Sequence, residues 1–131
     1  MKRLFSLALF AALATTVVSC SDSTSPSASL AGTYSLRTVN GSSLPVTLCC
    51  DAFGAPYQLL SAEISLDANG NYSSVDRYSD GTQTATGYWT LSGDQLTLVD
   101  NAGFQTFATV SGNQLVLTNV GGTSMTAVYQ R

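Results

Sequence analysis

The sequence has 131 residues, of which 44% are hydrophobic and only 10% are charged, and its formal net charge is −3. This length suits one small domain. The sequence contains no His, which removes the commonest general base, the commonest zinc ligand and every nucleophile that His activates. Eight acidic side chains outnumber five basic ones, so we expect no nucleic-acid partner.

Residues 1–19 are typical of a bacterial secretory signal. Lys2 and Arg3 form a short basic region, and the segment Leu4 to Val18 that follows carries no charge. This apolar stretch is shorter than the roughly 20 residues that a membrane-spanning helix needs. We therefore expect it to be removed after export rather than to span the membrane.

The end of this segment, Val17-Val18-Ser19-Cys20, resembles the lipobox of bacterial lipoproteins. The resemblance implies that Cys20 becomes the lipid-modified first residue of the mature chain and anchors it to a membrane. Ser21 follows, where lipoproteins retained at the inner membrane have Asp, which implies the outer membrane. We thus expect a lipid-anchored protein of the cell envelope that faces the periplasm or the exterior.

Residues 20–29 form a Ser-rich segment with almost nothing to bury. Such a segment cannot offset the entropy cost of ordering, so we expect a flexible tether. The remaining residues, 30–131, are predicted to form the folded domain.

The domain sequence is typical of consecutive antiparallel strands. Short runs of β-branched and aromatic residues alternate with tight-turn sequences such as Asn40-Gly41 and Asp80-Gly81. An up-and-down meander of eight or nine strands usually removes its edges by closing into a barrel, so we predict an all-β barrel. The predicted strands are Gly32–Val39, Leu44–Leu48, Gln58–Leu66, Asn71–Tyr78, Gln83–Leu91, Gln95–Val99, Phe104–Val110, Gln114–Asn119 and Thr123–Gln130.

An internal repeat supports this interpretation. Residues 89–103 align without a gap on residues 108–122, so two hairpins are predicted to share one turn and one side-chain register. In that register Trp89 and Leu91 lie on the same face as Leu96 and Leu98.

Three segments resemble small bacterial lipoproteins with a lipocalin-like domain: residues 32–36, the hairpin 88–98 and the closing residues 127–131. Lipocalins begin their first strand with Gly-x-Trp and cover that ring with an Arg from the last strand. Here Tyr34 stands at the Trp position, and Arg131 is the final residue, where chains often fray. The resemblance implies a lipocalin-like barrel, and no binding residue is transferred from the family.

The pair Cys49-Cys50 is the most unusual local feature. In an oxidising envelope the pair could form a vicinal disulfide, remain as two thiols or pair with another chain. The segment that follows contains Phe53 and Tyr57, which could cap the barrel mouth and, with Trp89, contact a ligand. The alternative is a hydrophobic plug that merely closes the barrel.

Other candidate sites are weaker. The segment 67–71 resembles the start of a calcium loop but lacks the required Gly and closing acid, so we interpret it as a hairpin turn and expect no metal site. Glu63, Asp76 and Asp80 are interpreted as solvated strand charges rather than as a catalytic pair. The six Tyr residues are interpreted as core and cross-strand packing.

The sequence therefore predicts a monomeric, non-enzymatic lipoprotein without cofactor that binds a small apolar ligand inside its barrel. The alternative is a structural or protein-interaction module of the envelope, for example an inhibitor, whose barrel is filled with side chains. The volume of the interior separates the two hypotheses.

Overall fold

The computed structural model describes residues 29–120 and 123–131. The predicted signal (1–19) and all but the last residue of the predicted tether (20–29) lie outside the described residues. The described strands are β1 (Gly32–Val39), β2 (Ser42–Ser43), β3 (Val46–Leu48), β4 (Tyr57–Leu66), β5 (Asn71–Tyr78), β6 (Gly81–Ser92), β7 (Gln95–Asp100), β8 (Gln105–Ser111), β9 (Gln114–Thr118) and β10 (Thr126–Gln130). Among the described residues, no helix is long and apolar enough to span a membrane.

Eight of these strands close into an antiparallel barrel, which confirms the predicted all-β fold class. β4 to β10 follow one another around the wall, and β1 pairs with β10 on one side and with β4 on the other. Ser35 lies at the closure, since it is registered with Gln130 of β10 and with Glu63 of β4. The closed wall leaves no long unpaired edge among these eight strands.

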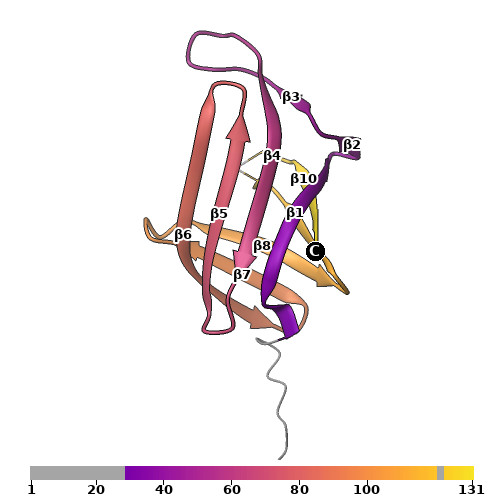
Figure 1. Ribbon diagram of the computed structural model, residues 1–131, viewed down its shortest axis with the longest axis vertical. Helices are drawn as coiled ribbons and strands as arrows, with labels where there is room; N and C mark the ends of the chain where they lie inside the picture. Colours follow the sequence, from indigo (N-terminus) through magenta and orange to yellow (C-terminus); the bar gives the residue numbers. More distant parts are fainter. Residues whose placement is uncertain (1–28, 121–122) are drawn as a thin grey trace, which may run out of the picture.

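The wall divides where β1 and β4 separate. β1 pairs with β4 only from Gly32 to Ser35, and beyond this point β2 pairs with the end of β1 while β3 pairs with the start of β4. Figure 1 shows β2 and β3 beside this separation and the loop between β3 and β4 projecting above it. The short β2 strand was not predicted, and the predicted strand Leu44–Leu48 is shorter, because β3 begins at Val46, after Pro45, which has no backbone N–H to donate to a neighbouring strand.

The barrel has two distinct ends. At the end that we call closed, β1 begins and β10 ends at Gln130, followed by Arg131. The turns β4–β5, β6–β7 and β8–β9 lie at the same end. At the opposite end, which we call open, lie the long β3–β4 loop and the connections β5–β6, β7–β8 and β9–β10. In Figure 1 the β3–β4 loop and the β5–β6 connection of the open end are uppermost.

The repeated hairpins have the predicted common register. Trp89 is registered with Leu98 and Leu91 with Leu96, and the second hairpin places Ala108 and Val110 opposite Leu117 and Leu115 in the same way. Both turns use a glycine with positive φ, Gly93 (φ 63°) and Gly112 (φ 60°), a conformation that other residues rarely adopt. The apolar members of both hairpins therefore face the barrel interior.

Large side chains fill the closed end. Tyr34, Leu96 and Leu115 are fully buried, and Trp89 is 5% exposed; we call these four residues the closed-end core. The Trp89 indole Nε1 donates a hydrogen bond of 3.0 Å to the carbonyl oxygen of Asp67 in the β4–β5 turn. This part of the barrel thus combines dense apolar packing with satisfied polar groups.

Arg131, the final residue, covers this core. Its guanidinium carbon lies 5.4 Å from the centre of the Tyr34 ring, a cation–π arrangement. Its Nη1 donates to the carbonyl oxygen of Ala31 over 3.1 Å. The Tyr34 hydroxyl donates to the carbonyl oxygen of Leu30 over 2.9 Å, which fixes the ring beneath the guanidinium.

Candidate functional site

The barrel interior beyond the closed-end core contains a cavity of about 150 Å³, which we call the inner cavity. Every strand from β4 to β10 contributes inward-facing side chains to its wall or its rim. The apolar wall residues are Ile64, Ala85, Leu98, Leu117 and Val120, and the polar ones are Tyr72, Ser74, Asp76, Asp100, Thr106 and Tyr129. A cavity of this size accommodates roughly one six-membered ring.

Asp76 lies in this wall, so its interpretation as a solvated strand charge is wrong. On β5 it is registered between Ala62 of β4 and Gln83 of β6, and its side chain lines the inner cavity. Burial raises the pKa of its carboxyl group, and a hydrogen bond with the Tyr78 side chain partly offsets this increase. The other two acids of that group, Glu63 and Asp80, do not line the cavity.

Tyr129 presents its hydroxyl to the same cavity. The residue is 7% exposed, and burial, followed by the nearby charges of Asp76 and Tyr78, raises the pKa of its hydroxyl. No hydrogen bond to this hydroxyl is found among the described residues, where no fully buried side-chain polar atom lacks a partner, so the hydroxyl oxygen itself is not fully buried. Because the residue lines the cavity, a bound molecule can act as a hydrogen-bond partner of this hydroxyl.

Asp100 also lines the cavity but has a structural task. Its Oδ1 accepts hydrogen bonds of 2.9 Å from the backbone N–H groups of Ala102 and Phe104, which hold the β7–β8 turn. Asp51 and Asp67 hold their own turns with the same spacing, through the N–H groups two and four residues later. Asp76 is in the middle of a strand, so it has no turn to hold.

A second pocket adjoins the inner cavity at the open end. This mouth pocket has a volume of about 270 Å³ and shares Val120 with the wall of the inner cavity. Tyr57 and Tyr78 stand in it edge to face, with ring centres 5.6 Å apart, and burial raises the pKa of Tyr78 to about 12. The other lining residues are Leu48, Cys49, Thr123 and Met125, so no side chain with a formal charge lines this pocket.

The structure does not bring the three residues predicted to contact a ligand into one site. Tyr57 lines the mouth pocket, as the capping hypothesis requires. Phe53 is 95% exposed at the β3–β4 loop and lines neither cavity. Trp89 belongs to the closed-end core, at the other end of the barrel.

Cys49 and Cys50 are joined by a vicinal disulfide at the start of the β3–β4 loop. Asp51 follows and fixes the loop, since its Oδ1 accepts from the N–H groups of Phe53 and Ala55. Cys49 lines the mouth pocket. The disulfide therefore forms part of the rim of the candidate site.

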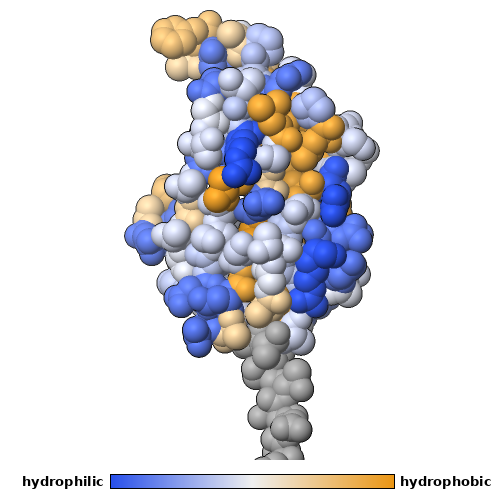
Figure 2. Space-filling view, viewed as in Figure 1, coloured by the Kyte–Doolittle hydropathy of each residue, from blue (hydrophilic) through white to orange (hydrophobic). Residues whose placement is uncertain are grey.

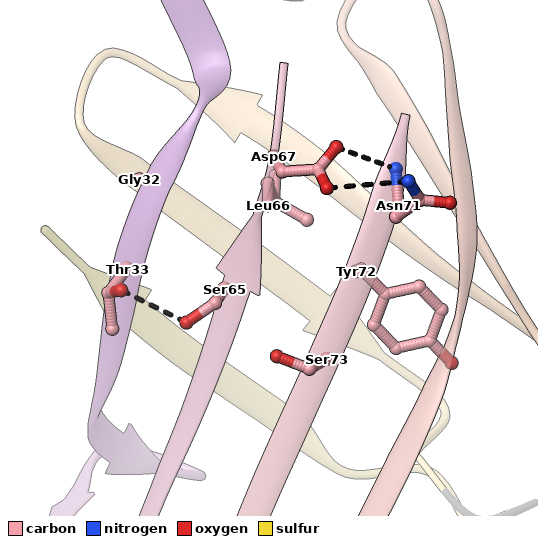
Figure 3. A pocket seen from close by; sticks show the side chains of 8 residues that line it. All are labelled: Gly32, Thr33, Ser65, Leu66, Asp67, Asn71, Tyr72 and Ser73. Carbon is pink, nitrogen blue, oxygen red and sulfur yellow. Dashed lines mark hydrogen bonds between the residues drawn. The ribbon is translucent and has the colours of Figure 1, made fainter. Parts of the chain in front are cut away.

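A pocket of about 300 Å³ on the outer wall near the closed end is a weaker candidate. Figure 3 shows the Asp67 carboxylate directed at Asn71, and the hydroxyls of Thr33 and Ser65 directed at each other. These groups satisfy one another, and hydrogen bonds from Asn71 above all lower the pKa of Asp67. The segment 67–71 is thus the predicted hairpin turn, and within the described residues no group of three or more acids or cysteines converges as a metal site would require.

Apolar side chains on the outer surface gather over β3 and the adjoining part of β4 (Figure 2). Leu44, Val46 and Leu48 of this region are partly buried against the core, and Leu60 is 47% exposed. This surface covers the separation between β1 and β4 rather than forming a second cavity.

Sequence reasoning missed Asp76 and Tyr129, although the alternation of side chains contained a signal. Tyr72, Ser74, Asp76 and Tyr78 occupy alternate positions of one strand and therefore one face. Because Tyr72 is an expected core residue, the same face had to carry Asp76 inward. The sequence does not show that the opposing side chains leave a cavity there.

Comparisons with known proteins give a weak structural similarity and no family. No family model matches the chain, and no curated protein matches it. Among solved structures, the chain is similar to the crystal structure of the Cpx pathway activator NlpE from Escherichia coli, with 19% identity and a TM-score of 0.44. The similarity covers 61% of this chain and 43% of the length of that one.

Proposed function

We propose that this protein is a lipid-anchored, monomeric and non-enzymatic component of the bacterial cell envelope that binds one small, largely apolar ligand in its barrel. The observation that carries the proposal is that the inner cavity and the mouth pocket are neighbours, since Val120 lines both. A ligand that occupies both spaces would leave the closed-end core in place. Membrane attachment through Cys20 and an outer-membrane position rest on the signal sequence.

The interior supports a small ligand rather than a large one. The inner cavity of about 150 Å³ is below the few hundred Å³ typical of sites for drug-sized molecules, and the closed-end core fills the remaining interior. The mouth pocket adds room for an apolar extension of the ligand. We therefore favour a ligand of roughly ten to fifteen heavy atoms, lying lengthwise in the barrel.

The alternative function, a protein-interaction module, is favoured by one observation. Phe53 is 95% exposed, although the β3–β4 loop that carries it is held by four hydrogen bonds around Asp51. An ordered loop that presents a bare aromatic side chain is typical of a contact site. The two functions are separable, because Phe53 lines neither cavity.

Native mass spectrometry tests the ligand. The full chain with Cys20→Ser would be secreted to the periplasm without its lipid, purified, and compared before and after denaturation. We expect the native sample to carry an additional mass of roughly 100 to 300 daltons that is lost on unfolding. The bare polypeptide mass, with no uptake from an added envelope extract, would contradict ligand binding and favour the interaction module.

A matched pair of variants locates the ligand. Ala85 lines the inner cavity, whereas the neighbouring Thr84 is exposed on the outer face of the same strand. Ala85→Leu should fill part of the cavity and remove the additional mass, and Thr84→Leu should leave it unchanged. Retention of the mass in Ala85→Leu would place the ligand elsewhere.

A further inference from the structure

The inner cavity has negative groups in its wall and no positive ones. Asp76 and Asp100 line it, and none of its lining residues is Lys or Arg. Arg131 lies at the closed end against Tyr34 and Ala31, and Arg37 and Arg77 are exposed. A carboxylate removed from water is costly unless a counter-charge or several hydrogen bonds compensate it. A cationic ligand would provide this compensation.

The two carboxylates are not equivalent toward a ligand. Asp100 already accepts two backbone N–H groups, which compensate part of its charge. Asp76 has no such turn to hold, and its hydrogen bond comes from the side chain of Tyr78. Asp76 is therefore the carboxylate that a positively charged ligand would meet.

Tyr129 provides an independent indication that a polar group of the ligand lies here. Tyr129 lines the cavity, its side chain is 7% exposed, and no hydrogen bond to its hydroxyl is found among the described residues. Asp76 lines the same cavity, and its charge contributes to the raised pKa of the Tyr129 hydroxyl. An ammonium group has three N–H donors, so it can bind the Asp76 carboxylate and the Tyr129 oxygen at the same time.

The adjoining mouth pocket requires a different chemistry. Leu48, Tyr57, Tyr78 and Met125 line it, and its lining includes no formal charge. A second charged group on the ligand would find no partner there, whereas an aromatic or aliphatic group would pack against the two tyrosines. The inner cavity thus has a polar, negatively charged wall, whereas the mouth pocket toward the opening is mainly apolar.

We infer that the ligand is an amphipathic primary amine, whose ammonium group binds between Asp76 and Tyr129 in the inner cavity and whose apolar part occupies the mouth pocket. This inference rests on the proposed function, because it names the chemical class of the ligand in the same site. It excludes fatty acids, since their carboxylate would oppose Asp76 in a wall without a cation.

Three probes of similar size and different charge test the inference. The binding of 2-phenylethylamine, 2-phenylethanol and 3-phenylpropionate to the Cys20→Ser chain would be measured by calorimetry near pH 7. We expect the amine to bind at least about ten times more tightly than the alcohol, and the carboxylate to bind least. Equal affinity for the amine and the alcohol, or no binding of the amine, would overturn the inference.

Asp76→Asn removes the charge while preserving the shape of the side chain, and Asp94→Asn, in the exposed β6–β7 turn, is the matched control. The preference for the amine should disappear in Asp76→Asn and persist in Asp94→Asn. Persistence in both variants would overturn the role of Asp76. The comparison of probes on the unsubstituted site stands even if Asp76→Asn fails to fold.

The same measurements distinguish failure of this inference from failure of the proposed function. A native ligand whose mass is found, but which is neutral or acidic, would refute the amine and preserve the binding function. A bare polypeptide that also takes up none of the three probes would refute both.

Discussion

The two ends of the barrel are built from the same strands but filled in different ways. At the closed end, Tyr34, Leu96 and Leu115 are fully buried, and Arg131 covers them. Farther along the same strands the inward positions carry Asp76 and Asp100, and an inner cavity remains. Strand pairing continues across the boundary, so the difference lies in the side chains and not in the backbone.

This difference separates stability from binding within one small domain. Burial of large apolar side chains contributes most where they fill the interior completely. An inward carboxylate and an empty volume both reduce stability, so their presence in the same barrel requires the well-packed closed end. Variants that are matched between the two regions can test this division.

Leu96 and Leu98 offer the sharpest comparison, because they are the same residue type on one strand. Leu96 is 0% exposed in the closed-end core, whereas Leu98 is 3% exposed and lines the inner cavity. Leu96→Ala should lower the free energy of unfolding by about 2–5 kcal/mol, as large cavities in packed cores do. Leu98→Ala should lower the free energy of unfolding less than Leu96→Ala does, and the difference between the two losses should be about 1 kcal/mol or more. The reason is that Leu98 borders the inner cavity and already lacks neighbours on one side.

Urea unfolding of the two variants and of the unsubstituted chain would measure these values. Equal losses for both variants would show that the cavity wall is packed as tightly as the closed-end core, which would remove the basis of the comparison. A ligand that co-purifies would fill the cavity and must be removed first, since it would stabilise the folded state.

Substitution of Gly87 tests how closely the backbones of β6 and β7 approach each other where the two regions meet. It lies opposite Asp100, and a Cβ atom built on it would lie 1.9 Å from the carbonyl oxygen of Val99. Gly87→Ala should therefore force β6 and β7 apart and lower the free energy of unfolding by about 1–3 kcal/mol. Thr84→Ala, at an exposed position of β6, is the control and should change it by less than about 0.5 kcal/mol.

The tight approach of β6 and β7 would be disproved if Gly87→Ala were as stable as its control. In that case the two strands would have to move apart freely at this point. Amide hydrogen exchange of the β6 and β7 backbone would detect this separation of the strands independently of urea unfolding.

Much of the wall could be predicted from the sequence, because it depends on local signals. The hairpin repeat fixes the register of β6 to β9, since a shift of one residue would turn Leu96 and Leu98 outward. The Gly93 and Gly112 turns set the hairpin lengths. These features need only neighbours in sequence, and the structure reproduces them.

The site depends on contacts between distant segments, so sequence patterns could not define it. Alternation indicates that Asp76 faces inward, but the volume left around it depends on side chains from seven strands. Trp89 was predicted as a ligand contact because aromatic residues occur in both cores and cavities. Its hydrogen bond to Asp67, a residue of another hairpin, places it at the closed end instead.

The acids of the two regions should respond to pH with opposite signs. The pKa of Asp67, at the closed end, is lowered by hydrogen bonds from its turn, so its ionised form stabilises the fold. This contribution is present above the ordinary value of 3.8 and is lost as pH falls through the lower pKa of the folded state. The pKa of Asp76 is raised by burial, so the folded state binds its proton more strongly than the unfolded state. Its contribution to stability therefore falls as pH rises from 3.8 through the raised pKa.

Unfolding of Asp67→Asn and Asp76→Asn between about pH 3 and pH 7 would measure the two signs. Near pH 7 we expect Asp67→Asn to be less stable than the unsubstituted chain and Asp76→Asn to be more stable, with both differences decreasing toward pH 3. A loss of stability in Asp76→Asn at neutral pH would mean that its charge is already compensated within the protein, and a cationic ligand would then be unnecessary. A gain in stability together with a loss of amine binding would identify Asp76 as a residue retained for the ligand, because packing alone would favour the uncharged side chain.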